Sequence, residues 1–159
     1  MRTIMIVDDD PLLCAALQFK FERAGYQVCA GGNGQDLLAH LEVRQPDLIL
    51  LDLMMPDMSG IEVLKHLRRD PAPSSIPVLV MTAWDHSDIR AKCLELGAAG
   101  VVAKPFSLGE LVMQVEEHLA RGQAGVSGKG KRIEGDRQKQ ASEGIPQQVA
   151  KPRGNAQVV

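Results

Sequence analysis

The sequence predicts an α/β protein built on a doubly wound, mostly parallel sheet, and two observations carry this prediction. Over residues 1–120, five short apolar runs alternate strictly with five segments whose apolar residues recur at helical spacing. Some of the runs, such as residues 47–51, are apolar almost throughout, which indicates strands covered by helices on both faces. Strict alternation of strands and helices is typical of parallel sheets with crossover helices.

The first strand and the first helix are predicted from clear local signals. Residues 3–7 ("TIMIV") form a short, mainly apolar run. A helix is expected at residues 11–25, because Asp10 is a favoured N-cap, Pro11 suits the first helical position and Gly25 suits the end. Asp10 is therefore expected to cap this helix rather than to bind a ligand.

The middle of the chain continues the alternation. A second strand is expected at residues 26–30 and a second helix at residues 34–44. The run at 47–51 is the third strand, and it leads through a loop of mixed polarity into a third helix at residues 61–69.

The last elements are predicted in the same way. A fourth strand is expected at residues 76–81, a fourth helix at 86–97, and a fifth strand at 100–103. The final helix is expected at 107–120, because its apolar residues share one helical face. They are Leu108, Leu111, Val112, Val115 and Leu119.

Charge and composition divide the chain after residue 120. Residues 1–120 hold 10 Lys/Arg and 17 Asp/Glu, a net charge of −7, whereas residues 121–159 hold 8 Lys/Arg and 3 Asp/Glu, a net charge of +5. The second segment has seven glycines, no aromatic residue and no periodic apolar face, so it cannot offset the entropy of ordering. We predict one domain at 1–120 and a disordered, basic Gly/Gln-rich tail at 121–159. A solvated tail is the favoured interpretation, and nucleic acid is not an expected partner.

Targeting signals and cysteine motifs are not evident in the sequence. The first apolar run is too short for a signal peptide or a membrane span, and no later run is long enough for a membrane span. We therefore expect a cytoplasmic protein without membrane insertion. The three cysteines are isolated and lack CxxC spacing, which favours neither a disulfide framework nor a zinc site.

Five polar residues lie where predicted strands end. Asp8 and Asp9 follow the first strand, Asp52 the third, Thr82 the fourth and Lys104 the fifth. Open parallel sheets place their binding and catalytic residues beyond the carboxyl ends of the strands. We therefore expect these side chains to converge on one site.

Four motifs that contain these residues resemble the receiver domain of bacterial two-component response regulators: "IVDDDP", "LLDLMMPDMSG", "VLVMTAW" and "GAAGVVAKPF". The resemblance covers residues 3 to about 120. It implies a flavodoxin-like (βα)5 fold with a five-stranded parallel sheet in the order 2-1-3-4-5. It also implies a signalling domain rather than an enzyme, one that catalyses only its own phosphorylation and dephosphorylation. Because the tail of 39 residues is too short and too polar for a DNA-binding module, we expect a stand-alone receiver.

The resemblance implies a role for each residue of the expected site. Asp52 would accept the phosphoryl group. Mg²⁺ would be bound by Asp52, by Asp9 directly, by Asp8 directly or through water, and by the backbone carbonyl of Met54. Hard oxygen ligands of this kind suit Mg²⁺.

Two further residues would act on the phosphoryl group itself. Thr82 would offer its hydroxyl to a phosphoryl oxygen. Lys104 would pair with Asp52 before transfer and with the phosphoryl group afterwards. Met54 and Trp84 flank the site in this family, and we expect their large apolar side chains to hinder attack by water.

The resemblance also implies partners and a switch. A sensor histidine kinase or a histidine phosphotransfer protein would supply the phosphoryl group. An unknown output protein would bind the face formed by helix 4, strand 5 and helix 5, and a phosphorylation-dependent homodimer is a further expectation. The family has an aromatic residue three positions before the lysine, whereas this chain has Val101, which puts the aromatic part of the switch in doubt.

Two alternatives stay open at this point. A haloacid-dehalogenase-like phosphatase would use Asp8 and Asp10, but residue 12 is Leu rather than Thr or Val, and that hypothesis leaves Asp52 unexplained. The chain could also be the receiver part of a longer regulator whose output domain is missing. For the bond before Pro105, the resemblance implies that the cis form seen in the family is open to it, but X-Pro alone makes trans the default expectation.

Overall fold

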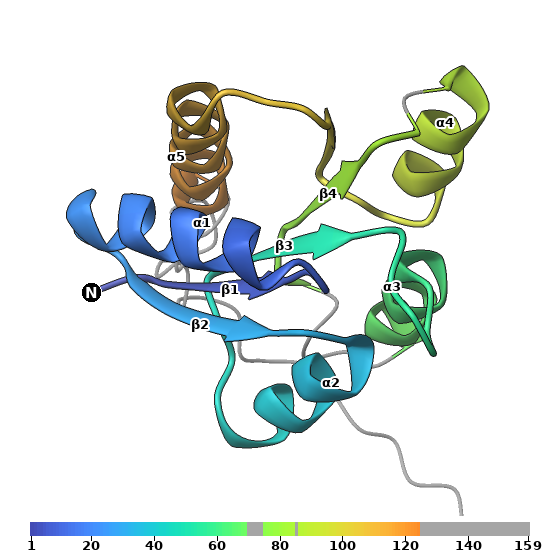
Figure 1. Ribbon diagram of the computed structural model, residues 1–159, viewed down its shortest axis with the longest axis horizontal. Helices are drawn as coiled ribbons and strands as arrows, with labels where there is room; N and C mark the ends of the chain where they lie inside the picture. Colours follow the sequence, from blue (N-terminus) through green and yellow to red (C-terminus); the bar gives the residue numbers. More distant parts are fainter. Residues whose placement is uncertain (70–74, 85, 125–159) are drawn as a thin grey trace, which may run out of the picture. The chain divides into compact units, whose positions relative to one another are not determined.

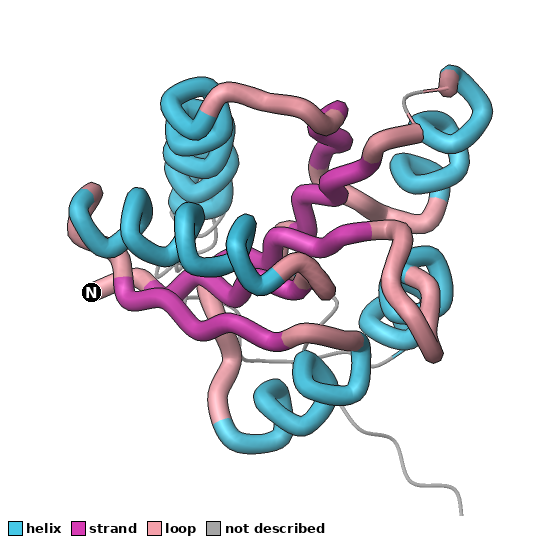
Figure 2. The backbone as a smooth tube through the Cα atoms, viewed as in Figure 1, coloured by secondary structure: helices cyan, strands magenta, loops and turns pink. Residues whose placement is uncertain are grey.

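The computed structural model describes residues 1–69, 75–84 and 86–124 (Figures 1 and 2). The strands are β1 (Thr3–Val7), β2 (Gln27–Gly31), β3 (Leu48–Asp52), β4 (Val78–Thr82) and β5 (Gly100–Ala103). The helices are α1 (Pro11–Arg23), α2 (Gly34–Val43), α3 (Gly60–Arg69), α4 (Ser87–Glu95) and α5 (Leu108–Ala124). All ten predicted elements are present. Beyond residue 124, the predicted tail lies outside the described residues.

The five strands form one parallel sheet in the order β2-β1-β3-β4-β5, which confirms the expected topology. In the register of the sheet, Val7 lies opposite Leu51, and Asp52 lies opposite Met81. The ends of β1, β3 and β4 are therefore level with one another. This alignment brings the residues that follow the strands to one edge of the sheet.

Helices cover both faces of the sheet, with α1 and α5 on one face and α2, α3 and α4 on the other (Figure 1). Successive residues of a strand point to opposite faces, so each buried strand supplies two separate cores. Leu50 packs in the core beneath α1 and α5, and Leu51 packs in the core beneath α2 to α4. Burial on both faces explains why the sequence of β3 is apolar with no alternation.

Several element boundaries differ from the prediction by one or two residues, and one differs by four. The edge strand β2 is half-exposed and lies one residue later than expected, because its apolar signal is weak. Helix α5 continues to Ala124, four residues past the predicted end at 120. Gly122 does not end the helix, and the last turns hold an ion pair between Arg121 and Glu117 at 2.5 Å.

Local signals at the ends of elements were mostly correct. Asp10 caps α1, since its Oδ1 accepts hydrogen bonds from the backbone N–H groups of Leu12 (2.9 Å) and Leu13 (3.2 Å). The peptide bond between Lys104 and Pro105 is cis, so the default expectation of a trans bond was wrong.

Within the described ranges, no helix combines the length and the apolar character needed to cross a membrane.

Candidate functional site

Three aspartates from two neighbouring strands form an acidic cluster at the carboxyl edge of the sheet. Asp8 and Asp9 follow β1, and Asp52 is the last residue of β3. One carboxylate oxygen from each lies within 4.8 Å of the others. Asp8 and Asp52 are only 2% and 3% exposed, whereas Asp9 is open to solvent. The predicted convergence is therefore confirmed for these three residues.

Lys104 reaches this acidic cluster from β5, on the far side of β4. Its ammonium donates to Oδ2 of Asp8 at 2.6 Å and to Oδ1 of Asp52 at 3.1 Å. The other oxygen of Asp8, Oδ1, accepts the backbone N–H of Asp10 at 2.9 Å. The family resemblance implied that Lys104 pairs with Asp52, and the structure shows that Asp8 shares the lysine and lies closer to it.

The electrostatics of the cluster follow from burial and from these contacts. Burial raises the pKa of Asp52, and the Asp8 carboxylate adds to the rise, while the Lys104 ammonium opposes both. Burial on its own lowers the pKa of Lys104, but its hydrogen bond to Asp8 and the charges of Asp52 and Asp8 outweigh it, so the pKa is raised. Lys104 therefore stays charged in the cluster.

The donor set of this cluster fits a hard divalent cation. Three carboxylates face one ammonium, so the cluster keeps an excess of negative charge. All the donors are oxygens, which Mg²⁺ prefers. Lys104 and Asp10 already bond the two oxygens of Asp8, so Asp9 and Asp52 are better placed as direct ligands.

Thr82 lies beside the cluster, at the end of β4, and is completely buried. Its hydroxyl oxygen accepts the backbone N–H of Trp84 at 2.9 Å. The hydroxyl therefore restrains the start of the loop that leads into α4. Trp84 is 53% exposed and Met54 is 48% exposed, and the backbone N–H of Met54 helps to hold Asp52 ionised. The predicted metal contact of the Met54 carbonyl stays a prediction.

The loop between β3 and α3 is folded tightly against the phosphoacceptor candidate. A Cβ atom on Gly60 would lie 2.3 Å from the carbonyl oxygen of Asp52, so only glycine fits there. Ser59 and Glu62 close the loop with a capping box, in which the Ser59 N–H donates to Glu62 at 2.9 Å and the Glu62 N–H donates to the Ser59 hydroxyl at 3.3 Å. Our sequence analysis missed this motif, although the S-x-x-E spacing signals it.

Val101 takes the place of the family's aromatic residue on β5. It is 7% exposed and packs in the core beneath α2 to α4. A short aliphatic side chain at this buried position cannot swing between an inner and an outer position as a ring does. The replacement of the family's aromatic residue by Val101 therefore lies in the buried core.

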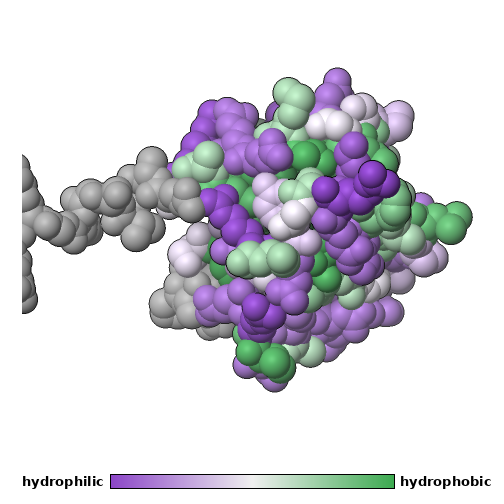
Figure 3. All heavy atoms as spheres, turned by 90° about the vertical axis from the view of Figure 1, so that its left-hand side faces the viewer, coloured by the Kyte–Doolittle hydropathy of each residue, from purple (hydrophilic) through white to green (hydrophobic). Residues whose placement is uncertain are grey.

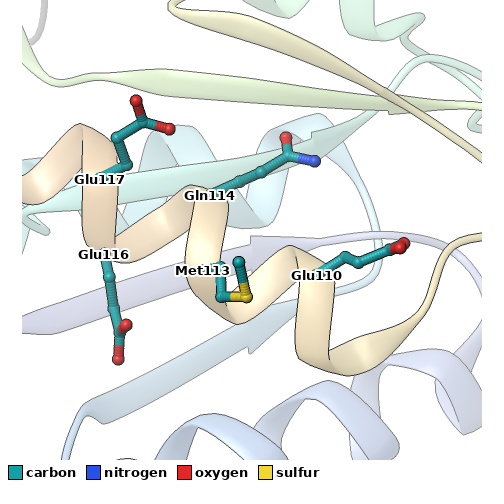
Figure 4. Close-up of a pocket in the computed structure, with 5 residues that line it drawn as sticks. All are labelled: Glu110, Met113, Gln114, Glu116 and Glu117. Carbon is teal, nitrogen blue, oxygen red and sulfur yellow. The ribbon is translucent and has the colours of Figure 1, made fainter.

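Surface hollows outside the acidic cluster are lined by residues of other kinds. One of about 370 Å³ adjoins Lys104, and it is lined by Asp10, Leu13, Ala83, Pro105, Phe106 and Leu108. Another of about 600 Å³ lies along the exposed face of α5 (Figure 4). There Glu110, Glu116 and Glu117 point in different directions from the helix, so they do not converge as the three aspartates do (Figure 4). Apolar residues are scattered among polar ones on the surface that Figure 3 shows.

Comparison with known proteins identifies the family. Residues 4–116 match the model described as "Response regulator receiver domain". This chain therefore belongs to the response regulator receiver family, whose members are signalling domains.

Two relatives of this chain are transcriptional regulatory proteins. The chain is 39% identical over 120 residues to the alkaline phosphatase synthesis transcriptional regulatory protein PhoP of Bacillus subtilis, covering 76% of this chain and 49% of that protein. It is 40% identical over 120 residues to the phosphate regulon transcriptional regulatory protein PhoB of Pseudomonas aeruginosa, covering 76% and 52%. The chain thus spans about half the length of the curated relatives it matches.

Solved structures confirm the fold. The signal receiver domain of a putative Luxo repressor protein from Vibrio parahaemolyticus superposes with a TM-score of 0.75 at 27% identity, covering 82% of this chain and all of that one. A putative response regulator from Chloroflexus aurantiacus gives a TM-score of 0.71 at 32% identity, covering 76% and 98%.

Proposed function

We propose that Asp52 accepts a phosphoryl group from a phosphohistidine of a sensor histidine kinase or a histidine phosphotransfer protein. The observation that carries this proposal is the convergence of Asp8, Asp9 and Asp52 on the ammonium of Lys104 at the carboxyl edge of the sheet. These groups come from three different strands, and no separate structural need explains their meeting. A carboxylate paired with a cation is the form that a phosphoryl acceptor requires.

The transfer step is an in-line exchange at phosphorus. An oxygen of the Asp52 carboxylate forms the new O–P bond while the P–N bond to the donor imidazole breaks. The electron pair of that bond goes to the imidazole nitrogen. Lys104 lies between Asp8 and Asp52, so its ammonium is close to the phosphoryl oxygens and offsets their charge.

Asp9 and Asp52, with Asp8 and the backbone carbonyl of Met54, are the groups that would hold Mg²⁺. When bound, Mg²⁺ neutralises charge on the phosphoryl oxygens. Asp8 has a second role that does not depend on the metal. It holds Lys104 at 2.6 Å and is itself held by the Asp10 N–H, so it positions the lysine beside Asp52.

The output of the switch would begin at Thr82. The Thr82 hydroxyl can donate to a phosphoryl oxygen while it still accepts the Trp84 N–H, so a shift of the hydroxyl toward that group would draw the loop before α4 with it. The face formed by α4, β5 and α5 would then bind an output protein or a second phosphorylated copy of the chain. With Val101 on β5, this response relies on the loop rather than on an aromatic ring.

The phosphatase alternative is less well supported. It needs Asp10 as a second catalytic acid, but Oδ1 of Asp10 is engaged with two backbone N–H groups of α1. The alternative of a longer regulator gains support, because the chain covers only about half of the transcriptional regulators that it matches. In that case an attached output domain would take the place of a separate output protein.

Beryllofluoride, which mimics a carboxylate-bound phosphoryl group, separates these functions. With Mg²⁺ present, we expect ¹⁹F NMR to show one protein-bound adduct in the wild type. Asp57→Asn should show the same adduct, because the Asp57 carboxylate is exposed in the nearby loop. Asp52→Asn should give none. An adduct that persists in Asp52→Asn and disappears in Asp8→Asn would favour the phosphatase instead.

The lifetime of the phosphorylated form would depend on the two half-exposed side chains beside the site. Met54 and Trp84 are apolar and large, so they would hinder an attacking water. Trp84→Glu and Met54→Asn should therefore shorten the half-life of the acyl phosphate. Half-lives equal to that of the wild type would overturn this part of the proposal.

A further inference from the structure

Helix α4 is held to the domain differently at its two ends. Among the five helices it buries the fewest residues, with Cys93 alone fully buried, whereas α3 buries Gly60, Val63, Leu64 and Leu67. Its N-cap, His86, makes no side-chain capping hydrogen bond, although the N-cap residues of α1 and α2 do. The N-terminal end of α4 therefore lacks the side-chain cap that α1 and α2 have, although Ile89 packs against the core there.

The C-terminal end of α4 is fixed by Arg68, which comes from α3. Its Nη2 donates to the carbonyl oxygen of Gly97 at 2.9 Å, and both Nη atoms lie 3.3 Å from the carbonyl oxygen of Ile76. One guanidinium thus ties the turn after α4 to the residues just before β4. The hydrogen bonds of a charged donor to two carbonyls are stronger than those between neutral groups.

The turn itself is built to receive this side chain. Gly97 has φ +92°, and a Cβ atom there would lie 2.8 Å from Nε of Arg68. The N–H groups of Gly97 and Ala98 bond back to α4, to the carbonyls of Leu94 and Cys93, both at 2.9 Å. The Ala99 N–H bonds to Val78 of β4 at 2.8 Å. Every amide of this turn is therefore engaged.

We infer that Arg68 and Gly97 form a pivot about which α4 turns, with its N-terminal end moving and its C-terminal end staying in place. The N-terminal end of α4 begins five residues after Thr82, whose hydroxyl accepts the Trp84 N–H. A phosphoryl group that draws the Thr82 hydroxyl toward it would draw the Trp84 amide as well, which displaces the chain at the moving end. This last step rests on the proposed function, whereas the anchor itself does not.

Amide hydrogen exchange on the unphosphorylated full chain tests the anchor alone. Arg68→Met keeps the stem of the side chain and removes its donors, and we expect exchange of the Gly97, Ala98 and Ala99 amides to rise about tenfold or more. Arg69→Met, at the exposed neighbouring position, is the matched control and should leave these rates within about twofold of wild type. Equal effects in both variants would overturn the inference.

Two additions keep this test decisive. Arg68→Lys retains a cation that reaches one carbonyl, so it should give intermediate rates, and it serves if Arg68→Met fails to fold. A uniform rise over the whole sheet would show general loss of stability and would contradict a local pivot.

Beryllofluoride then tests the movement. In the wild type we expect the amide chemical shifts of Trp84 and residues 86–90 to change strongly and those of residues 97–99 to change little. Strong changes at 97–99 would overturn the pivot. If the probe does not bind Asp52 at all, the proposed function fails, while the exchange measurements still decide whether Arg68 anchors the helix.

Discussion

The buried strands and the acidic cluster at their ends are continuous in the chain, yet they have opposite effects on folding. Every residue of β1, β3 and β4 is buried, and the removal of their apolar surface from water stabilises the fold. The cluster holds Asp8, Asp9 and Asp52 close together, and burial raises the pKa of Asp52. A buried carboxylate with a raised pKa disfavours the folded state at neutral pH.

This contrast between the buried strands and the acidic cluster shows how a rigid sheet can hold carboxylates close together. A sheet packed on both faces fixes the positions of the strand ends, so like charges are held together that would separate in a flexible chain. Their mutual repulsion would be relieved by a bound cation, as the proposed magnesium site requires. Changes in the core and changes in the cluster should therefore affect stability and chemistry separately.

The largest expected effect is on the core. Phe21, on α1, is fully buried in the core beneath α1 and α5, and its ring meets that of Tyr26 edge-on with 6.0 Å between the centroids. Phe21→Ala should lower the free energy of unfolding by about 3–5 kcal/mol, as measured by urea denaturation. Phosphorylation of the folded fraction should keep its wild-type rate. Phe19 is exposed, and Phe19→Ala should cost less than about 0.5 kcal/mol. Equal losses in the two variants would contradict the assigned core.

Removal of the shared cation should have the next largest effect. Lys104→Met leaves two buried carboxylates without their partner and should cost about 3 kcal/mol at neutral pH without divalent cations. Because the pKa of Lys104 is raised in the folded state, the stabilisation that its ammonium provides is present below the unfolded-state pKa and is lost as the pH rises through the folded-state pKa. Lys104→Met should not show this loss of stability at alkaline pH. Lys92→Met, at an exposed ion pair, should change little.

Removal of the buried charge should act in the opposite direction. Asp52→Asn should stabilise the metal-free chain by an amount on the order of 1 kcal/mol, while it abolishes phosphorylation. The raised pKa of Asp52 means that its protonation favours the folded state at low pH, and this contribution is lost as the pH rises through the folded-state pKa. Thermal unfolding from pH 4 to 8 should show that loss in the wild type and not in the variant. A lower melting temperature of Asp52→Asn at pH 7 would refute the proposed repulsion.

The smallest effect separates two adjacent aspartates. Asp10→Ala should cost about 1 kcal/mol through loss of the cap of α1, with phosphorylation intact. Asp9→Ala should abolish Mg²⁺-dependent phosphorylation with little change in stability. Parallel denaturation and phosphorylation assays check both. If both variants lost phosphorylation equally, the division between cap and ligand would be wrong.

Most of the fold could be predicted because the buried strands leave a strong signal. β1 and β5 were predicted with their observed bounds, whereas β3 and β4 were placed one or two residues too early, because an apolar run shows that a strand exists more clearly than where it ends. β2 was displaced by one residue, and its half-exposed residues give a weak apolar signal. The end of α5 was placed too early, because a change in composition at residue 120 says nothing about the i,i+4 pair that Arg121 makes with Glu117.

The composition of the acidic cluster could be predicted, but its internal geometry could not. The rule that strand ends meet at one edge of a parallel sheet was enough to bring Asp8, Asp9, Asp52 and Lys104 together. Which carboxylate lies nearer the lysine depends on distances across three strands, and the sequence carries no signal for these. The anchor of α4 was missed for the same reason, because Arg68 bonds to backbone carbonyls, whose positions no side-chain pattern reveals.

The central claim is that Asp52 is the phosphoryl acceptor of the acidic cluster. Incubation of the full chain with phosphoramidate and Mg²⁺, followed by peptide mapping by mass spectrometry, tests it directly. We predict a single phosphoryl group on Asp52, and none when Mg²⁺ is chelated or in Asp52→Asn. A phosphoryl group found on Asp8 or Asp9, or one still incorporated by Asp52→Asn, would contradict the account.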